Sequence, residues 1–236
     1  MNVTNSIKIA KTLAIGSFFC LYAWACQSPA KQENASQVDT LSVSPDSIVS
    51  NSPAFVSLED PQRDAWSKPA KVLEFMGDLH GKTLVDIGAG SGYFTYFFAQ
   101  TNCQKVISVD IDEQFLAYIN DRKQELDSGH KIETRLGEVQ GPPLSVGEAD
   151  VITLVNTSYY IQDLSGYFTH LHAALSASGV LYIIDFNQET EAALPQHPYI
   201  SQAKVREALK NAGFSRISID TQLLPYQYIA VAKKVK

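Results

Sequence analysis

The period of the hydrophobic and polar positions changes repeatedly from Lys82 onward. Short runs of apolar, mostly β-rich residues alternate with segments in which apolar residues recur every three or four positions. The runs predict strands, and the longer periodic segments predict helices. The strands are expected over 83–87, 106–110, 132–136, 151–155 and 180–185, and the helices over 94–100, 113–127, 165–177 and 201–211.

This alternation predicts a parallel sheet. Strands that are so uniformly apolar are typical of a sheet covered by helices on both faces. Gly179 is expected to end the third helix and Gly213 the fourth. The last two apolar runs, 216–223 and 226–233, flank Pro225 with no room for a helix between them, so they are expected to form an antiparallel hairpin.

The N-terminal segment follows a different pattern. Residues 1–11 are polar with two lysines, residues 12–25 are apolar without charge, and the three residues before Cys26 read AWA, the small-x-small form of a signal-peptidase site. The apolar run is too short for a membrane span. We therefore expect residues 1–25 to be an export signal.

Cys26 immediately follows that cleavage site, which resembles a bacterial lipoprotein signal whose cysteine becomes the lipidated first residue. A simple secretory signal cut after Ala25 and a retained anchor helix are the alternatives, and each leaves the protein outside the cytoplasm. Residues 26–53 are rich in Ser, Gln, Asn, Pro and Asp and are expected to form a disordered tether. The folded domain is expected over 54–236.

The net charge and the cysteine content restrict the kinds of partner and site that we expect for this chain. The formal net charge is −6 and would be −8 without the signal, which carries two lysines and no acid. An acidic domain has no general attraction for nucleic acid. We therefore expect a small-molecule or protein substrate, no nucleic acid, and membrane contact only through a lipid on Cys26. Cys20 and Cys26 precede the domain and only Cys103 lies within it, so no disulfide framework or metal site is expected.

A glycine-rich turn carries the candidate chemistry. Residues 85–92 read VDIGAGSG, and they end the first expected strand and open a helix. Glycines there let the backbone turn tightly and approach a ligand closely. The second strand ends at Asp110, twenty residues beyond Gly90, where a carboxylate can accept hydrogen bonds from both hydroxyls of a ribose. The combination indicates recognition of adenosine.

A nicotinamide dehydrogenase shares the turn and the acid but fits less well. Its fingerprint has a third glycine three residues after the second, where this chain has Tyr93. The terminal hairpin is also foreign to the six-stranded parallel domain of that class.

With the strand before Asn156 and the closing hairpin, these features resemble the class I S-adenosylmethionine-dependent methyltransferases over about 55–236. The stretch 60–69 (DPQRDAWSKP) is similar to the start of an exported, lipoprotein-like bacterial subgroup. The resemblance implies a three-layer α/β/α, Rossmann-like fold with a seven-stranded, mostly parallel sheet and an antiparallel C-terminal strand. It also implies S-adenosylmethionine as the cofactor, bound across the carboxyl ends of the strands.

The same resemblance assigns residues to the cofactor. Asp86 is expected to fix the ammonium group, the glycine turn to shape the loop under the methionine part, and Asp110, with Ile111 beside it, to hold the ribose. Asp110 could instead cap the next helix, although Asp112 is better placed for that task. The expected cofactor-binding residues are Asp86, Gly88, Ala89, Gly90, Gly92, Asp110, Ile111, Glu138, Val139 and Asn156.

Two of these assignments have competing interpretations. Glu138, which with Val139 follows the third strand where the family places residues beside adenine, could also be a solvated loop residue. Asn156 ends the fourth strand and is expected to hold the cofactor or the substrate by its amide, or else to form a turn.

Catalytic candidates follow the fourth strand or end the fifth: Tyr159, Tyr160 and Asp185. The subgroup has histidines where this chain has the two tyrosines, so no histidine-based role is expected, and an aromatic pair is also common in packing. Any of the three could accept a proton from the nucleophile. His197 is expected in a loop that borders the substrate.

The segment before the sheet is a candidate lid. Trp66 would exclude water, Arg63 would meet a carboxylate and Lys68 follows them, although a helix packed by its tryptophan is the simpler interpretation. We predict a methyltransferase with an unidentified acceptor. The alternative is an exported, non-catalytic binding module that kept the nucleoside-binding scaffold.

Overall fold

The computed structural model describes residue 58, residues 60–187 and residues 198–234. The predicted signal, Cys26, the tether and His197 lie outside these described residues. Within them, no helix combines the length and the apolar character needed to cross a membrane.

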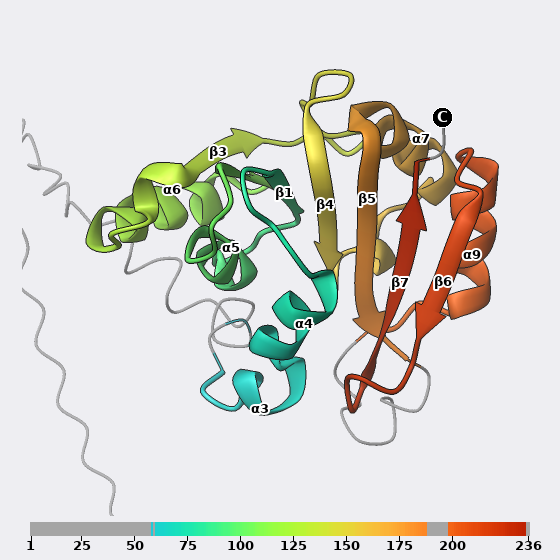
Figure 1. Ribbon diagram of the computed structural model, residues 1–236, viewed down its shortest axis with the longest axis horizontal. Helices are drawn as coiled ribbons and strands as arrows, with labels where there is room; N and C mark the ends of the chain where they lie inside the picture. The colour runs from blue at the N-terminus through green and yellow to red at the C-terminus, as the bar shows by residue number, and fades with distance from the viewer. Residues whose placement is uncertain (1–57, 59, 188–197, 235–236) are drawn as a thin grey trace, which may run out of the picture. The chain divides into compact units, whose positions relative to one another are not determined.

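Seven strands form one sheet in the order β3-β2-β1-β4-β5-β7-β6 (Figure 1). Neighbouring strands from β3 to β5 are parallel, whereas β7 runs antiparallel to both β5 and β6. The predicted mostly parallel sheet with an antiparallel last strand is confirmed. The strands span Thr83–Ile87 (β1), Lys105–Asp110 (β2), Ile132–Leu136 (β3), Ala149–Val155 (β4), Leu175–Phe186 (β5), Arg216–Asp220 (β6) and Gln227–Lys233 (β7).

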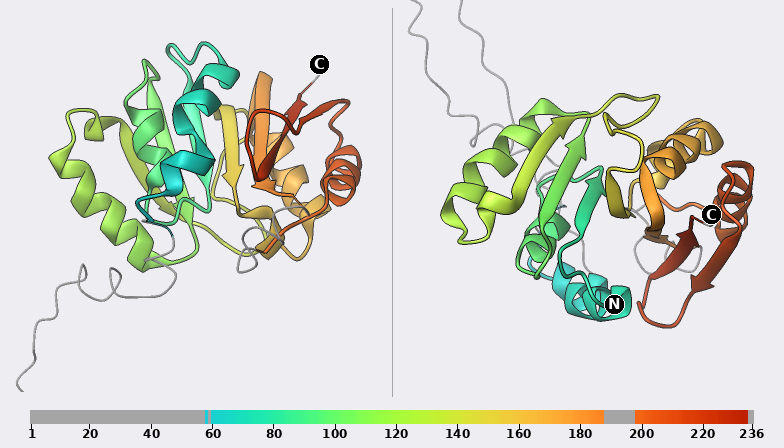
Figure 2. Two further views of the ribbon diagram at one scale, coloured as in Figure 1. Left: turned by 90° about the horizontal axis from the view of Figure 1, so that it is seen from below. Right: turned by 45° about the horizontal axis from the view of Figure 1, so that its top comes forward.

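Helices cover both faces of this sheet, which confirms the three-layer architecture (Figure 2). Successive side chains of a strand point to opposite faces. In β1, Val85 and Ile87 therefore belong to one apolar cluster, and Leu84 belongs to the other. The first cluster is completed by α7 (Leu164–Ala174) and α9 (Gln202–Asn211), and the second by α4 (Pro69–Met76), α5 (Tyr93–Ala99) and α6 (Glu113–Arg122).

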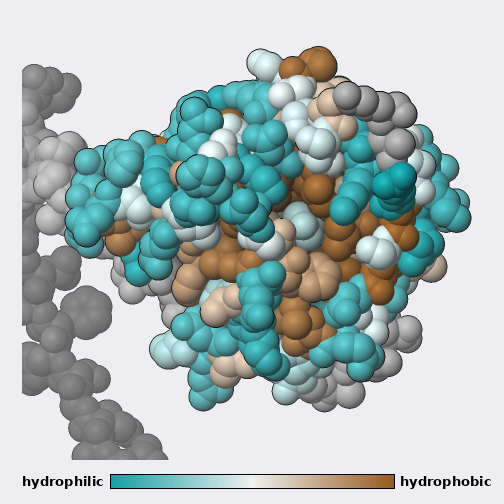
Figure 3. Space-filling view, viewed as in Figure 1, coloured by the Kyte–Doolittle hydropathy of each residue, from teal (hydrophilic) through white to brown (hydrophobic). Residues whose placement is uncertain are grey.

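The cover on the α4 face is partial. Figure 3 shows apolar residues gathered across the middle of this face, between hydrophilic surfaces. Phe75 of α4 lies edge-on to Tyr182 of β5, with ring centroids 6.5 Å apart, and remains exposed. An aromatic contact of this kind stabilises the margin of the helix on the sheet.

The helix predicted over 165–177 ends earlier than expected. It stops at Ala174, because Leu175 already pairs with Ala149 of β4 and begins β5. Gly179, expected to end the helix, lies inside that strand. The pairing register shifts after Leu175, so a bulge absorbs the residues that had been assigned to the helix.

Two other elements also end early. The helix predicted over 113–127 ends at Arg122 and continues only as a short 3-10 turn, Lys123–Glu125. The strand predicted over 216–223 ends at Asp220, because Asp220 Oδ1 accepts hydrogen bonds from the backbone N–H groups of Gln222 and Leu223. Such a local turn competes with the sheet ladder.

Two short helices precede the sheet, and the chain changes direction sharply between them. Lys68 joins α3 (Arg63–Ser67) to α4 with a φ of 44°, in the left-handed region. A non-glycine residue there costs of order 1 kcal/mol. Pro69 then starts α4 with a φ suited to a helix. This turn lets α4 pack on the sheet while α3 faces the ends of the strands.

Candidate functional site

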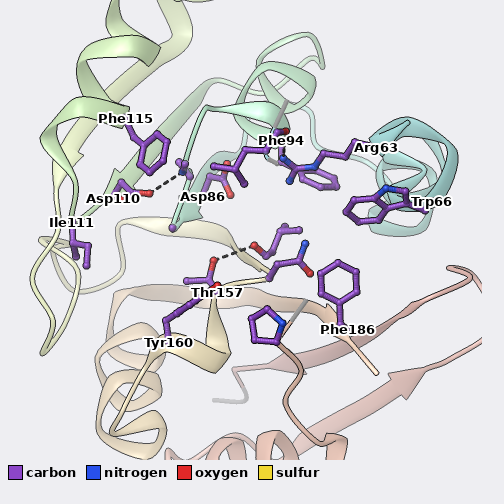
Figure 4. Close-up of a pocket in the computed structure, with 17 residues that line it drawn as sticks. Arg63, Trp66, Asp86, Phe94, Asp110, Ile111, Phe115, Thr157, Tyr160 and Phe186 are labelled. Carbon is purple, nitrogen blue, oxygen red and sulfur yellow. Dashed lines mark hydrogen bonds between the residues drawn. The ribbon is translucent and has the colours of Figure 1, made fainter. Parts of the chain in front are cut away.

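A cavity of about 340 Å³ opens at the carboxyl ends of four strands (Figure 4). Gly88 follows β1, Asp110 ends β2, Asn156 follows β4 and Phe186 ends β5. The strand order reverses between β1 and β4, which is where open α/β sheets bind their ligands. The cavity is lined by Leu58, Arg63, Trp66, Asp86, Gly88, Ala89, Gly90, Phe94, Asp110, Ile111, Phe115, Val155, Asn156, Thr157, Tyr160, Phe186 and Pro198.

The loop after β1 contributes backbone rather than side chains to this cavity. The N–H groups of Gly88 and Ala89 both donate to the carbonyl oxygen of Val109, at 2.8 and 3.1 Å, and so tie the loop to β2. Gly88 has a φ of 69°, and a Cβ atom there would lie 2.4 Å from Thr157 Oγ1. Only glycine meets both demands.

Asp86 is a buried carboxyl in the wall of the cavity. Its Oδ2 accepts a hydrogen bond from Thr95 Oγ1 at 2.8 Å, and its Oδ1 accepts one from Thr153 Oγ1 at 3.3 Å. Burial raises the pKa of Asp86 to about 6, although the two hydroxyls and the charge of Arg63 oppose the increase. The two hydroxyl donors are neutral and the pKa of Asp86 stays raised despite Arg63, so a cationic ligand group would further stabilise the ionised carboxyl.

Arg63 and Trp66 reach the cavity from α3 (Figure 4). The guanidinium carbon of Arg63 lies 4.0 Å from the centroid of the Tyr93 ring, and its Nη1 donates to the carbonyl oxygen of Leu58 at 2.7 Å. Trp66 packs against Phe186, with ring centroids 5.4 Å apart. Both side chains therefore have a packing role and a position at the cavity, while Lys68 does not line it.

Asp110 marks the other end of the cavity. Its Oδ2 accepts the N–H of Gly90 at 2.8 Å, and its Oδ1 accepts the N–H of Asp112 at 3.0 Å. Burial raises its pKa, and these backbone N–H groups oppose the increase. The helix cap is supplied by Asp112 instead, whose carboxylate accepts from Gln114 N–H. Each carboxylate oxygen of Asp110 keeps capacity to accept from a ligand hydroxyl.

The loop after β4 closes the cavity on a third side. Asn156 adopts a φ of 55°, and its N–H donates to Ile184 in β5 at 2.8 Å. Its Oδ1 accepts a hydrogen bond from Gln227 Nε2 of β7 at 2.8 Å. Thr157 Oγ1 lies 3.2 Å from the carbonyl oxygen of Ile87, which fixes this loop against the glycine turn.

A protein family described as a methyltransferase domain matches residues 62–219 of this chain. The chain belongs to this family. The match covers the sheet from β1 to β6, both helical layers and the whole cavity apart from Leu58. Membership confirms the predicted enzyme class, a methyltransferase. The predicted cofactor, S-adenosylmethionine, agrees with this class and with the solved S-adenosylmethionine-dependent structures that share the fold.

Individual relatives cover less of the chain. Ribosomal protein L11 methyltransferase of Tolumonas auensis is 32% identical over 107 residues, which are 44% of this chain and 36% of that protein. Demethylmenaquinone methyltransferase of Lactococcus lactis is 30% identical over 112 residues, which are 47% of this chain and 42% of the relative. The chain thus spans less than half of the length of either relative.

A solved structure supports the fold over a greater length. The S-adenosylmethionine-dependent methyltransferase from Aquifex aeolicus superposes with a TM-score of 0.68 at 23% identity. The alignment covers 81% of this chain and 99% of that one. At this identity the likeness concerns the fold alone.

Most of the predicted cofactor-binding residues of this methyltransferase meet at the cavity, but three do not line it. Gly92 lies behind the loop, where a Cβ atom would meet Tyr96 and Ile119. Glu138 forms a backbone bridge with Gly141, and Val139 is exposed. Their assignments to the cofactor stay predictions.

Only one of the three predicted catalytic residues lines the cavity. This residue is Tyr160, whereas Tyr159 does not line the cavity and packs edge-on against the ring of Tyr160, with ring centroids 5.5 Å apart. Asp185 does not line the cavity either. It is buried in β5, where burial raises its pKa to about 7 and the N–H groups of Thr157 and Ser158 act in the opposite direction. A proton-accepting role for Asp185 stays a prediction.

Several aromatic lining residues were missed from the sequence. Phe115 lies one turn into α6, Phe94 near the start of α5 and Phe186 at the end of β5. Apolar residues at such positions look like core residues in a sequence, and only their closeness to the carboxyl ends of the strands, directly or at the start of the next helix, distinguishes them.

The raised pKa of Asp86 predicts a pH-dependent affinity. Asp86 is predicted to hold the ammonium group of the cofactor, which prefers the ionised carboxyl, so lowering the pH from about 7.5 to about 5 should weaken binding of S-adenosylhomocysteine roughly tenfold by calorimetry. Asp86→Asn should bind weakly at both pH values. Without ligand, folding favours the protonated form, so stability from this group is lost as the pH rises from about 4 through about 6. If the affinity depended on pH equally in the wild type and in Asp86→Asn, Asp86 would not be the group that binds the ammonium.

Proposed function

We propose that this chain transfers a methyl group from S-adenosylmethionine to a small-molecule acceptor. The observation that carries the proposal is the order of three charged groups along the cavity, with Asp110 at one end and Asp86 and Arg63 towards the other (Figure 4). The cofactor has hydroxyls on its ribose and an ammonium and a carboxylate on its methionine part. The charged groups therefore follow one another along the cavity in the same order as the polar groups of the cofactor that they would bind.

The end of the cavity at Asp110 fits the adenosine part of the cofactor, because apolar residues line the cavity beside this carboxylate. Phe115 and Ile111 line the same end of the cavity, and both could contact a flat base. Asp110 is held by Gly90 and Asp112, so its carboxylate is already oriented before a ribose arrives. Such preorganisation reduces the entropic cost of binding.

The methionine end supplies one anion and one cation. Asp86 would hold the ammonium group, and Arg63 would hold the carboxylate, since a guanidinium matches carboxylate geometry. Arg63 lowers the pKa of Asp86, so the two charges interact electrostatically within the protein. A zwitterionic ligand would pair with both.

When bound, the cofactor supplies a methyl group on a sulfonium, which is activated for attack by a nucleophile. The chain has to hold the acceptor in line and exclude water. Trp66 and Phe186 form an apolar wall suited to that task. A non-catalytic binding module remains the competing function, and turnover with any acceptor distinguishes the two.

The ribose contact is testable by isothermal titration of the purified chain with S-adenosylmethionine, S-adenosylhomocysteine and NAD. Asp110→Asn removes the charge that accepts from the hydroxyls, so affinity for both adenosyl ligands should fall by about tenfold or more. Asp112→Asn makes the same change of charge two residues away and should bind normally. Equal losses in both variants, or tighter binding of NAD, would contradict the proposal.

We also propose that the protein is an exported lipoprotein, in which residues 1–25 are removed, Cys26 is lipidated and residues 26–53 tether the domain. The polar, apolar and small-x-small order of residues 1–25 supports this proposal. The full chain expressed in bacteria should therefore appear in the membrane fraction with a mature N-terminus at Cys26. Cys26→Ser should lose the lipid mass. A mature chain that keeps Met1 or the apolar run would overturn it.

A further inference from the structure

The methyl acceptor would bind beside the methionine end of the cavity, among lining residues that are not assigned to the cofactor. Three charged side chains line the cavity within the described part of the chain, and the proposed function assigns all of them to the cofactor: Arg63, Asp86 and Asp110. Among the described residues, the rest of the lining is apolar or aromatic, apart from the amide of Asn156 and the hydroxyls of Thr157 and Tyr160. A charged acceptor group would lose hydration there without gaining a partner of opposite charge from these residues.

An aromatic wall bounds this end. The rings of Trp66 and Phe186 pack at a centroid distance of 5.4 Å with an interplanar angle of 41°, and both lie at the same side of the cavity (Figure 4). Phe186 is nearly fully buried, so it offers little open surface to a ligand and instead supports the ring of Trp66. Flat aromatic ligands gain more from such a wall than aliphatic ligands of similar size.

The amide of Asn156 has a defined orientation. Gln227 Nε2 donates to its Oδ1 at 2.8 Å and uses one of the two lone pairs of that oxygen, whereas Nδ2 makes no hydrogen bond to the described residues and can donate to a ligand. Gln227 is itself buried in β7, opposite Phe186 in the ladder. Its own Oε1 has no hydrogen-bond partner, so among the described residues the side chain of Gln227 makes a single hydrogen bond, the one to Asn156.

From the aromatic wall and this directed donor, we propose that the acceptor is an uncharged phenol that stacks on Trp66, which Phe186 supports, and accepts a hydrogen bond from Asn156 Nδ2 at its oxygen. Gln227 is the positioning residue that orients the amide. This inference rests on the proposed function. A lone pair of the phenol oxygen forms the new O–CH₃ bond, the methyl–sulfur bond breaks with its electron pair passing to sulfur, and the phenolic proton leaves to water.

The donor also explains how the proton can leave without a charged base. A hydrogen bond to the oxygen is stronger when that oxygen is an anion, so Asn156 would lower the pKa of a bound phenol. An aliphatic alcohol starts from a much higher pKa and would gain too little from one amide.

The first test uses p-cresol as the probe, with the full chain saturated by S-adenosylhomocysteine. Ligand-observed NMR should detect binding of p-cresol at least about fivefold tighter than that of 4-methylcyclohexanol, 4-methylbenzoate or 4-methylbenzylamine. With S-adenosylmethionine, mass spectrometry should detect 4-methylanisole. Failure to bind S-adenosylhomocysteine would overturn the proposed function, whereas normal binding of it without preference for p-cresol would overturn only this inference.

The second test measures the role of Gln227 with 4-nitrophenol, whose phenolate absorbs visible light. Its pKa should be lower on the protein than in solution. Gln227→Met, which keeps the volume but removes the donor, should weaken binding about fivefold and reduce the pKa shift, and Asn156→Asp should reverse that shift. Gln222→Met, on the exposed turn before β7, is the matched control. Affinity for S-adenosylhomocysteine should stay within twofold in Gln227→Met, and an unchanged pKa shift in that variant would exclude the positioning role.

Discussion

The cavity exists because β1 is paired with β2 on one side and with β4 on the other. The chain leaves β1 through α5 to reach β2, and it later returns to the opposite edge of β1 to build β4 and β5. Connections on the two sides therefore diverge, and the carboxyl ends of β1 and β4 face a crevice that none of the described helices fills. The residues that we assign to a ligand lie at this reversal, at the neighbouring end of β2 and the start of α6, or on the helix α3.

Electrostatics add a second constraint to this geometry. Asp86 and Asp110 are carboxyls whose pKa values burial raises, so ionising either group costs free energy. Hydroxyl and backbone N–H donors keep the two groups in place but do not neutralise them. A ligand that brings a cation to one end and hydroxyls to the other removes part of that cost, which favours a nucleoside bearing an amino acid over a neutral ligand.

The sequence predicted the residues of local motifs, but it did not predict which residues at a strand end face the cavity. The turn after β1 and Asp110 were predictable, because glycine spacing and the end of an apolar run are local signals. Asp185 and Phe186 are adjacent at the end of β5, and both are buried, so no alternation of polar and apolar residues indicated which one faces the cavity. The structure places Phe186 there and Asp185 away from it. The contact between Gln227 and Asn156 joins residues 71 positions apart, and a pairing of β5 with β7 is needed to bring them together.

The most direct test of the central claim is a crystal structure of the chain with S-adenosylhomocysteine. The account predicts the ribose hydroxyls within hydrogen-bond distance of Asp110, the ammonium group at Asp86 and the carboxylate at Arg63, with the sulfur directed towards Trp66 and Phe186. A ligand bound in the reverse direction, with its adenine against Trp66 and Phe186 and its amino acid part at Asp110, would contradict it.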